Sequence, residues 1–518
     1  MGRGVAAELA GVALDPTGPA PLYRQLYDGI RAAILAGQLR AGTRLPATRD
    51  LAARLGVARL TVQTAFDQLA AEGYLEGRRG SGTYVAGTLP DALLEVRAGG
   101  GRPVAAGEHR RASPAHLAGH GRGFAAIMQR EGTPRPLQFG LPALDAFPTD
   151  LLARLAARRW RWAPPAFLGY GDSAGFGPLR DALADYLGAA RGVRCTPEQV
   201  LIVAGAQQGL SLIARALLAP GDAAWVEDPG YGGARAALAG AGAAISPVPV
   251  DAEGLDVAAG VARHPAARAV YVTPSYQFPL GVTMSLRRRL ALLDWADRAG
   301  AWVIEDDYDS EYRYVGRPLP ALQGLDTRGR VIYVGSLSKV LVPALHLGYL
   351  VVPPDLVAAL RDAHASAGRQ VAAVDQAVVA DFIAAGHFGR HIRRMRALYQ
   401  ERQRVLVAAA GEQLRGLLEV RPAAAGMHLV GRLPEEIDDR VAARRAERRG
   451  VRAAPLSAFS LGATGERGLL LGYAAYSAGQ IRATVGRLAV ALREVAGAGG
   501  GRLAEGEAPP QVDPPSRP

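Results

Sequence analysis

The chain has 518 residues, of which 49% are hydrophobic and 21% are charged, and its formal net charge is +12. This length and composition predict two or three globular domains, and the single cysteine, Cys195, excludes an intramolecular disulfide. No N-terminal run resembles a signal peptide and no uncharged stretch is long enough to span a bilayer. We therefore expect a cytoplasmic protein without a membrane partner. The positive charge permits an acidic partner such as DNA but does not require one.

Residues 18–86 have the pattern of a small helical domain that ends in a hairpin. Apolar side chains recur every four residues over 21–36, and two shorter helices are predicted over 48–55 and 59–72. Two short helices joined by a glycine turn form a helix-turn-helix, whose second helix enters the major groove of DNA. The hairpin predicted over 73–85 has a basic, glycine-containing turn, which is typical of a wing that contacts phosphate.

These segments resemble the winged-helix DNA-binding domain of the GntR regulators. The matching motifs are Leu45-Pro-Ala-Thr-Arg49-Asp-Leu-Ala, Leu55-Gly-Val, Arg59-Leu-Thr-Val, Leu69-Ala-Ala-Glu-Gly-Tyr-Leu75 and Gly80-Ser-Gly-Thr83. The resemblance implies a double-stranded DNA operator as partner. The residues that it implies to approach DNA are Arg49, Arg59, Thr61, Gln63 and Gly80. Arginine is common in the family at the position of Gln63, so one contact departs from the pattern. Solvated charge at a helix end is the alternative interpretation of Arg49 and Arg59.

Two segments are expected to lack a folded core. Residues 87–135 are rich in glycine, alanine, proline and arginine without any period, which favours a flexible, positively charged linker between domains. Residues 496–518 are dominated by glycine and proline, which favours a disordered tail.

Residues 136–495 are predicted to form an α/β domain. In its large part, about 136–385, short apolar runs such as 200–203 and 301–304 alternate with helical segments. This alternation indicates a mostly parallel central sheet covered on both faces. The remainder, about 386–495, is predicted to be a small C-terminal part. Because ligands gather at the carboxyl ends of strands in such sheets, the residues that follow each apolar run are the candidates for a site.

Lys339 is the only lysine among 60 basic residues. Arginine keeps its proton, whereas a lysine amine can lose its proton and form a Schiff base with an aldehyde. Ser336 and Ser338 stand beside it and can offer hydroxyl groups to a phosphate. A surface lysine left by chance is the alternative, and the motifs around it favour a site.

Three further motifs follow predicted strands. Gly205-Ala206-Gln207 opens a helix, where free backbone N–H groups bind phosphate. Tyr231 can stack on a flat ring, although an aromatic residue in this position is more often part of a core. Four carboxylates lie within residues 305–309, and a solvated acidic loop is the alternative for them.

Together these groups describe a site for pyridoxal 5'-phosphate (PLP). Lys339 would capture the aldehyde and the serines and helix start would hold the phosphate. Asp306 would keep a proton on the pyridine nitrogen, and Tyr308 would hydrogen-bond the phenolic oxygen. Tyr231 would stack on the ring.

The order and spacing of these motifs resemble the fold type I aminotransferases, in which Lys339 would be the catalytic lysine. With the N-terminal domain, the chain resembles the MocR (GabR-like) subfamily of GntR regulators over about residues 20–485. Glu305-Asp-Asp-Tyr-Asp-Ser-Glu-Tyr-Arg-Tyr314 is among its most specific motifs. The resemblance implies a homodimer and a small-molecule effector.

The chain departs from this pattern at positions that would bind anions. His346 stands where the family usually has an arginine that pairs with the cofactor phosphate, and histidine is a weaker partner. A family member that binds an amino acid has an arginine at the position of Gly233. A carboxylate-binding arginine is also expected near Leu470 and Leu471. We therefore expect an effector that is not a simple amino acid bound in the aminotransferase manner.

The sequence thus predicts a PLP-dependent transcriptional regulator whose aminotransferase-like domain senses PLP or a PLP-linked small molecule. One alternative is a catalytically active aminotransferase that carries a DNA-binding domain, and the missing arginines weigh against it. A second alternative is a regulator whose sensor has lost the cofactor. The retention of Lys339 as the only lysine weighs against that possibility.

Overall fold

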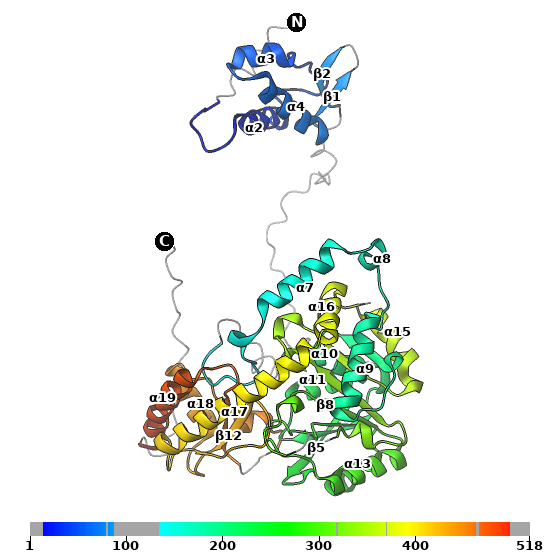
Figure 1. Cartoon of the computed structure of the whole chain (residues 1–518), viewed down its shortest axis with the longest axis vertical. Helices are drawn as coiled ribbons and strands as arrows, with labels where there is room; N and C mark the ends of the chain where they lie inside the picture. The colour runs from blue at the N-terminus through cyan, green and yellow to red at the C-terminus, as the bar shows by residue number, and fades with distance from the viewer. Residues whose placement is uncertain are drawn as a thin grey trace, which may run out of the picture. The chain divides into compact units, whose positions relative to one another are not determined.

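The computed structural model describes residues 14–78, 81–87, 134–316, 320–368, 370–462 and 466–497. The chain divides into two compact units, residues 1–117 and 118–518 (Figure 1). Most of the linker predicted over 87–135 lies outside the described residues, as do Gly80 and the chain beyond Gly497.

The first unit packs three helices with a two-stranded hairpin. Its elements are α2 (Leu22–Leu35), α3 (Thr48–Leu55), α4 (Arg59–Ala71), β1 (Leu75–Arg78) and β2 (Gly82–Val85). The strands pair antiparallel, with Leu75 opposite Val85. Gly56 ends α3 with a φ of 66°, the left-handed conformation that glycine adopts at helix ends. The predicted helix-turn-helix followed by a wing is therefore present.

Apolar periodicity explains how these helices pack. Leu26 and Ile30 of α2 and Val62, Phe66 and Leu69 of α4 form one buried cluster. Burying each of these side chains contributes about 1.5–3 kcal/mol relative to leaving it in water. The opposite face of α4 stays exposed and carries Arg59, Gln63 and Asp67 together with the exposed Leu60, so it is available for a partner.

The second unit is built on an eight-stranded sheet of order β3-β10-β9-β8-β7-β4-β5-β6. The strands are β3 (Val200–Val203), β4 (Ala223–Asp228), β5 (Ala244–Asp251), β6 (Gly254–Leu255), β7 (Ala269–Val272), β8 (Trp302–Asp307), β9 (Val331–Ser336) and β10 (Gly348–Val351). Neighbours from β5 to β9 along this order pair in parallel, whereas β10 is antiparallel to both β3 and β9. The mostly parallel sheet that the sequence predicts is confirmed.

Helices cover both faces of this sheet, because alternate residues of its strands face opposite ways. The covering helices are α9 (Gly177–Arg191), α10 (Gly205–Leu217), α11 (Gly232–Gly240), α12 (Val257–Arg263), α13 (Leu286–Ala299), α15 (Val357–Ala367) and α16 (Ala373–Ala384). Val226 and Ile304 pack in a cluster with residues of α10 and α11. Trp225 and Val303 pack instead with residues of α12 and α13.

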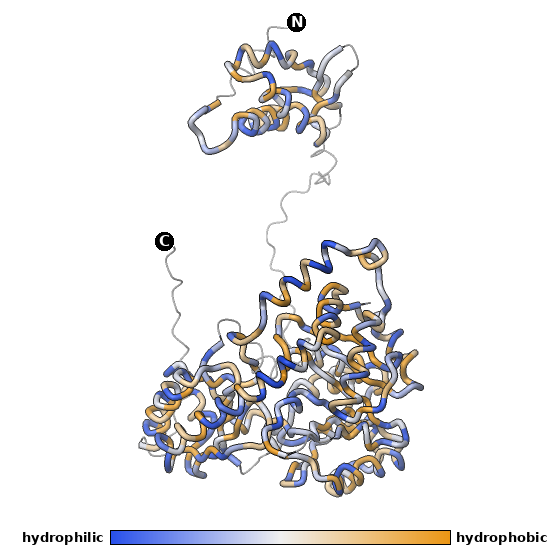
Figure 2. The backbone as a smooth tube through the Cα atoms, viewed as in Figure 1, coloured by the Kyte–Doolittle hydropathy of each residue, from blue (hydrophilic) through white to orange (hydrophobic). Residues whose placement is uncertain are grey.

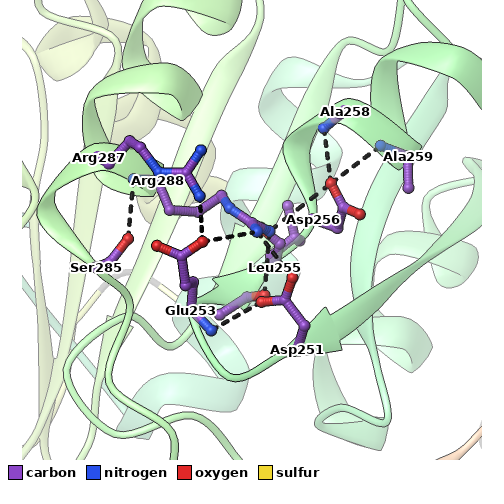
Figure 3. Close-up of polar contacts among 10 residues, drawn as sticks. Asp251, Glu253, Leu255, Asp256, Ala258, Ala259, Ser285, Arg287 and Arg288 are labelled. Carbon is purple, nitrogen blue, oxygen red and sulfur yellow. Dashed lines mark hydrogen bonds and ion pairs between the residues drawn. The ribbon is translucent and has the colours of Figure 1, made fainter.

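A buried arginine ties α13 to the far edge of the sheet (Figure 3). Arg288 donates to the carbonyl oxygen of Leu255 at 2.6 Å and pairs with Asp251 at 2.8 Å. Asp256 and Glu253 lie slightly farther from its guanidinium. Because Asp256 also caps α12 by accepting from Ala258 N, one cation fixes the strand edge and two helices.

The small C-terminal part has a four-stranded antiparallel sheet of order β11-β12-β14-β13. Its elements are α17 (His387–Gln413), β11 (Glu419–Val420), β12 (His428–Arg432), α18 (Asp439–Arg448), β13 (Ala454–Pro455), β14 (Gly468–Gly472) and α19 (Ala478–Gly497). In β14, Leu471 joins the core of this part, whereas Leu470 packs with Phe278 and Phe459 toward the large part. This alternation decides which leucine borders the candidate site.

Two helices before the sheet expose apolar side chains. In α7 (Thr149–Arg161), which alternates blue and orange in Figure 2, only Leu155 is buried. Trp160 and Trp162 are 62% and 77% exposed at its end, and Leu168 of α8 (Pro165–Leu168) is also exposed. Within the described part of the chain, no helix is both long and apolar enough to cross a membrane.

Candidate functional site

The short helix α14 (Leu337–Val340), directly after β9, positions Lys339. Ser336 caps this helix because its Oγ accepts from the backbone N–H of Ser338 at 3.3 Å. Lys339 Nζ donates to the carbonyl oxygen of Gly140 at 2.7 Å. Burial lowers the pKa of Lys339, while the carboxylates of Asp309 and Asp306 act against this shift. The amine is therefore held in place and loses its proton more readily than an exposed lysine does.

Asp306, near the end of β8, has one satisfied and one unsatisfied oxygen. Its Oδ2 accepts from the hydroxyl of Tyr271 at 2.7 Å. Its Oδ1 is buried and has no hydrogen-bond partner among the described residues. Burial raises the pKa of Asp306 to about 7, and the Tyr271 hydrogen bond opposes the shift. An unsatisfied buried acceptor costs about 1–3 kcal/mol, so this oxygen is suited to a donor supplied by a ligand.

Tyr308 and Tyr231 present the aromatic groups of the site. The hydroxyl of Tyr308 is buried and has no partner among the described residues. Tyr231 lies with its ring centroid 5.9 Å from that of Phe278 at an angle of 88°. Its hydroxyl donates to Gln207 Oε1 at 3.4 Å. One tyrosine thus offers a free hydroxyl and the other a positioned ring.

These side chains surround one cavity of about 90 Å³. Its lining comprises Phe139, Gly140, Ala206, Tyr231, Tyr271, Phe278, Asp306, Tyr308, Lys339, Met427 and His428. Five of the residues predicted for the cofactor therefore meet there: Lys339, Asp306, Tyr308, Tyr231 and Ala206. A neighbouring cavity of about 430 Å³ shares Phe139, Gly140 and Lys339 and has Arg440, Arg444 and Arg452 in its wall.

The other predicted cofactor residues, which do not line this cavity, are Gly205 and Gln207 at the start of α10, Ser336 and Ser338 at the start of α14, and His346. A Cβ placed on Gly205 would lie 3.7 Å from His346 Cε1, so the imidazole lies beside the first turn of this helix. Gly348 is opposite Ser336 in the sheet, and a Cβ on Gly348 would lie 2.9 Å from the carbonyl carbon of Gly205. The Gln207 side chain donates to the carbonyl oxygen of Gly233 at 2.9 Å. Ala206, in the first turn of α10, lines the cavity, and the start of a helix is suited to bind phosphate. Ser338 contributes its backbone N–H to the cap of α14.

The acidic stretch 305–309 is buried, so the alternative of a solvated loop is wrong. Asp307 pairs with Arg191 at 2.7 Å, and both side chains are almost fully buried. Glu305 accepts from the backbone N–H groups of Leu322 and Gln323. Burial raises the pKa of Glu305 to about 7. Of the four carboxylates in this stretch, Asp306 is the one that lines the cavity.

Several residues that line the cavity were not predicted from the sequence. Phe139 and Gly140 come from the segment before the sheet, and Met427 and His428 come from the small part. His428 is a polar residue in a buried strand, and this was the one signal that could have identified it. Its Nε2 donates to the carbonyl oxygen of Pro279 at 3.2 Å, and burial lowers its pKa to about 4.

Four of the five residues predicted to approach DNA are described in the first unit, on α3 and α4. Arg49 is exposed on α3, and Arg59 and Gln63 are exposed on α4 with Thr61 partly buried. Arg59 Nε donates to the hydroxyl of Thr48 at 3.4 Å, which links the two helices. The predicted wing glycine, Gly80, lies outside the described residues.

The chain matches two protein-family models. Residues 147–488 match aminotransferase class I and II, and residues 22–85 match the bacterial regulatory proteins of the gntR family. The probable rhizopine catabolism regulatory protein MocR of Rhizobium meliloti is 44% identical over 463 residues, covering 89% of this chain and 92% of that protein. The pyridoxine biosynthesis transcriptional regulator PdxR of Corynebacterium glutamicum is 34% identical over 478 residues, covering 91% and 96%.

Solved aminotransferases share the fold of most of the chain. A kynurenine aminotransferase of Pyrococcus horikoshii is 29% identical with a TM-score of 0.65, and the match covers 73% of this chain and 95% of that one. The α-aminoadipate aminotransferase LysN of Thermus thermophilus, complexed with N-(5'-phosphopyridoxyl)-L-leucine, is 30% identical with a TM-score of 0.66. That match covers 73% of this chain and 98% of LysN.

Proposed function

The chain belongs to the MocR-type transcriptional regulators of the GntR family, which carry an aminotransferase-like domain, and we propose that this domain binds PLP at Lys339 to sense a small molecule. The observation that carries the proposal is the cavity around the only lysine. It encloses one carboxylate oxygen and one hydroxyl that have no partner among the described residues. Two such groups beside a reactive amine are the features that a pyridine ring with a phenolic oxygen and an aldehyde would satisfy.

Each residue has a defined task toward the cofactor in this proposal. Lys339 holds the aldehyde carbon, Asp306 Oδ1 accepts from the ring nitrogen, and Tyr308 donates to the phenolic oxygen. Tyr231 stacks on the ring. When bound, PLP supplies an electrophilic carbon that primary amines can reach and a ring that accepts electron density.

The phosphate end uses the residues beside the cavity. The backbone N–H groups of Gly205, Ala206 and Gln207 at the start of α10 would bind the phosphate of PLP. The helix dipole favours negative charge there. Ser336 ends β9 and Ser338 follows it in α14, and His346 lies beside Gly205. His346 stands at the position where the family usually has an arginine that pairs with the cofactor phosphate.

The first unit gives the protein its operator-binding surface, as in other GntR regulators. Arg49, Arg59, Thr61 and Gln63 are the residues that we expect to contact DNA, with Gly80 in the wing. We further propose a homodimer, which would present two such surfaces to two half-sites. The exposed aromatic side chains Trp160 and Trp162 support this, because large exposed apolar groups mark interaction surfaces.

The test is whether PLP changes the affinity for DNA through Lys339. The operator is first obtained by selecting bound fragments from the DNA around the gene of this protein. Its Kd is then measured by fluorescence anisotropy for the wild type and Lys339→Ala, each with and without PLP. A change of about fivefold or more in the wild type and none in the variant supports the proposal. Equal operator affinities in all four samples would exclude PLP sensing.

A further inference from the structure

Among the described residues, the wall of the cavity of about 90 Å³ has no arginine that could hold a carboxylate next to the Lys339 amine. Among its lining residues the ionisable nitrogen groups are Lys339 itself and His428. A carboxylate brought into such a site needs a charged partner, because an unpaired buried charge is strongly unfavourable. Aminotransferase-like sites provide this partner as an arginine. In this chain the two positions where an arginine is expected are occupied by Gly233 and Leu470.

At the first position the structure leaves no room for an arginine. Gly233 is buried in the first turn of α11, and a Cβ placed there would lie 2.5 Å from ring carbons of Tyr231 and would also meet Gln207 Oε1. Any side chain at this position would therefore displace the aromatic ring that forms the cavity wall. The glycine is required by the packing of Tyr231, so the absence of arginine is built into the local structure.

At the second position an apolar cluster takes the space of a guanidinium. Leu470 is fully buried and packs with Phe278 and Phe459. The rings of Phe278 and Phe459 are perpendicular with centroids 5.1 Å apart, and Phe139 lies 5.7 Å from Phe278. Because Phe278 and Phe139 also line the cavity, the ligand meets a continuous aromatic wall on this side.

His428 presents a hydrogen-bond acceptor rather than a cation. A carbonyl oxygen can only accept, so the contact with Pro279 requires the proton on Nε2. Burial lowers the pKa of His428 to about 4, so the imidazole is neutral at pH 7 and Nδ1 carries a lone pair. A lone pair repels a carboxylate and attracts an N–H or O–H group. The guanidinium groups of Arg440, Arg444 and Arg452 line the neighbouring cavity, which shares Phe139, Gly140 and Lys339 with this one.

We propose that the small molecule sensed at this site is a primary amine with no carboxylate on the carbon that bears the amino group. This inference rests on the proposed function, because the amine is the group that exchanges with a lysine-bound aldehyde. In that exchange the ligand nitrogen replaces Lys339 Nζ on the aldehyde carbon, and its two hydrogens pass to Nζ. Neither an oxidant nor water is consumed. The aromatic wall then packs against the rest of the amine.

The test compares amines with amino acids that differ from them only by the carboxylate. The full-length protein is loaded with PLP, freed of unbound PLP and titrated with 2-phenylethylamine or L-phenylalanine, and with butylamine or L-norvaline. The readouts are the visible absorbance band and the thermal unfolding midpoint. We expect each amine to bind at least about tenfold more tightly than its amino acid. N,N-dimethyl-2-phenylethylamine, which cannot exchange, should leave the band unchanged.

A variant with an arginine in the aromatic wall should reverse this preference. Leu470→Arg is expected to bind L-phenylalanine more tightly than 2-phenylethylamine, and Leu470→Met should keep the wild-type order. If Leu470→Arg does not fold, the titrations of the wild-type protein with each amine and its amino acid still test the inference. A band that responds more strongly to the amino acids, or to neither member of a pair, overturns the inference alone. A protein that gives no visible band with PLP overturns the proposed function and this inference with it.

Discussion

Tyr271 donates its hydroxyl hydrogen to Oδ2 of Asp306 at 2.7 Å, while Oδ1 of the same carboxylate is buried without a partner among the described residues. The tyrosine comes from the middle of β7 and the aspartate from the end of β8, which are adjacent parallel strands. The hydrogen bond holds one oxygen of the carboxylate, and the other oxygen of this cavity-lining residue is left for a ligand to satisfy.

Replacing Asp306 should weaken cofactor binding. In Asp306→Asn the amide can still accept from Tyr271, but it has no charge to hold a proton on a ring nitrogen. Charge-assisted hydrogen bonds contribute about 1.5–3 kcal/mol, so the Kd for PLP should rise by about tenfold or more. Absorbance titration with PLP measures this constant. A Kd equal to that of the wild type would show that Oδ1 does not meet the ring.

The pH dependence of stability should be unusual in the PLP-free protein. Burial raises the pKa values of Asp306, Glu227 and Glu305 to about 7 in the folded chain. The folded state therefore binds more protons than the unfolded state between about pH 4 and pH 7. Ionisation of these groups on raising the pH through 7 opposes folding, so stability should fall across this range. Thermal unfolding between pH 5 and pH 8 checks the sign.

The control for this effect is Asp306→Asn without PLP. Because the variant has one fewer buried carboxylate to ionise, its unfolding midpoint at pH 8 should exceed that of the wild type. At pH 5 the two midpoints should be similar. A midpoint that rises steadily from pH 5 to pH 8 in the wild type would contradict the assignment of raised pKa values to these carboxylates.

Restoring an arginine beside the phosphate position should tighten PLP binding. His346 lies next to Gly205 at the start of α10, and a guanidinium is always charged and can bind a phosphate through two parallel hydrogen bonds. We expect His346→Arg to lower the Kd for PLP by about fivefold and His346→Ala to raise it. The same PLP titration applies. An unchanged Kd in both variants would separate His346 from the phosphate.

DNA binding should depend on the exposed residues of α3 and α4. Arg59→Ala and Arg49→Ala are each expected to weaken operator binding by about tenfold, because each removes a contact to a base or phosphate. Arg54→Ala, an exposed arginine in the last turn of α3, is the matched control for the loss of one positive charge. Anisotropy titrations at two salt concentrations measure both effects. Equal losses in all three variants would indicate a general charge effect instead.

The Arg288 cluster should stabilise the fold without affecting the cofactor. Arg288→Met leaves Asp251, Asp256 and the carbonyl oxygen of Leu255 without their cation, and should destabilise the second unit by about 2 kcal/mol. Arg287→Met is the control, because this arginine pairs with Glu253 on the exposed surface and should cost less than about 0.5 kcal/mol. Urea unfolding followed by circular dichroism compares the two variants. A PLP affinity that changes in Arg288→Met would contradict the separation of the cluster from the site.

The cavity residues predicted from the sequence lie at or just after the ends of strands of the central sheet. Asp306, Lys339 and Tyr231 were predicted because the carboxyl ends of parallel strands meet at one edge, and all three line the cavity. Apolar runs also predicted strands, since the run over 200–203 becomes β3 and most of the run over 301–304 becomes the start of β8.

The rest of the site depends on packing between distant segments. Gly140 receives the Lys339 amine although 199 residues separate them, and no local pattern encodes that contact. His428 reaches the cavity only because the small part folds against the large one. The buried pairing of Asp307 with Arg191, which overturns the solvated acidic loop, also joins residues far apart in the chain. Such contacts arise from the tertiary fold and not from periodicity or motif.

The visible absorbance spectrum of the purified protein with PLP tests whether Lys339 binds the cofactor. The spectrum of Lys339→Ala is recorded for comparison. Because Lys339 is the only lysine, a cofactor band that resists dialysis can come from no other side-chain amine in the chain. We predict such a band in the wild type and its loss in Lys339→Ala. The absence of a band in the wild type at excess PLP, or an equal band in the variant, would contradict it.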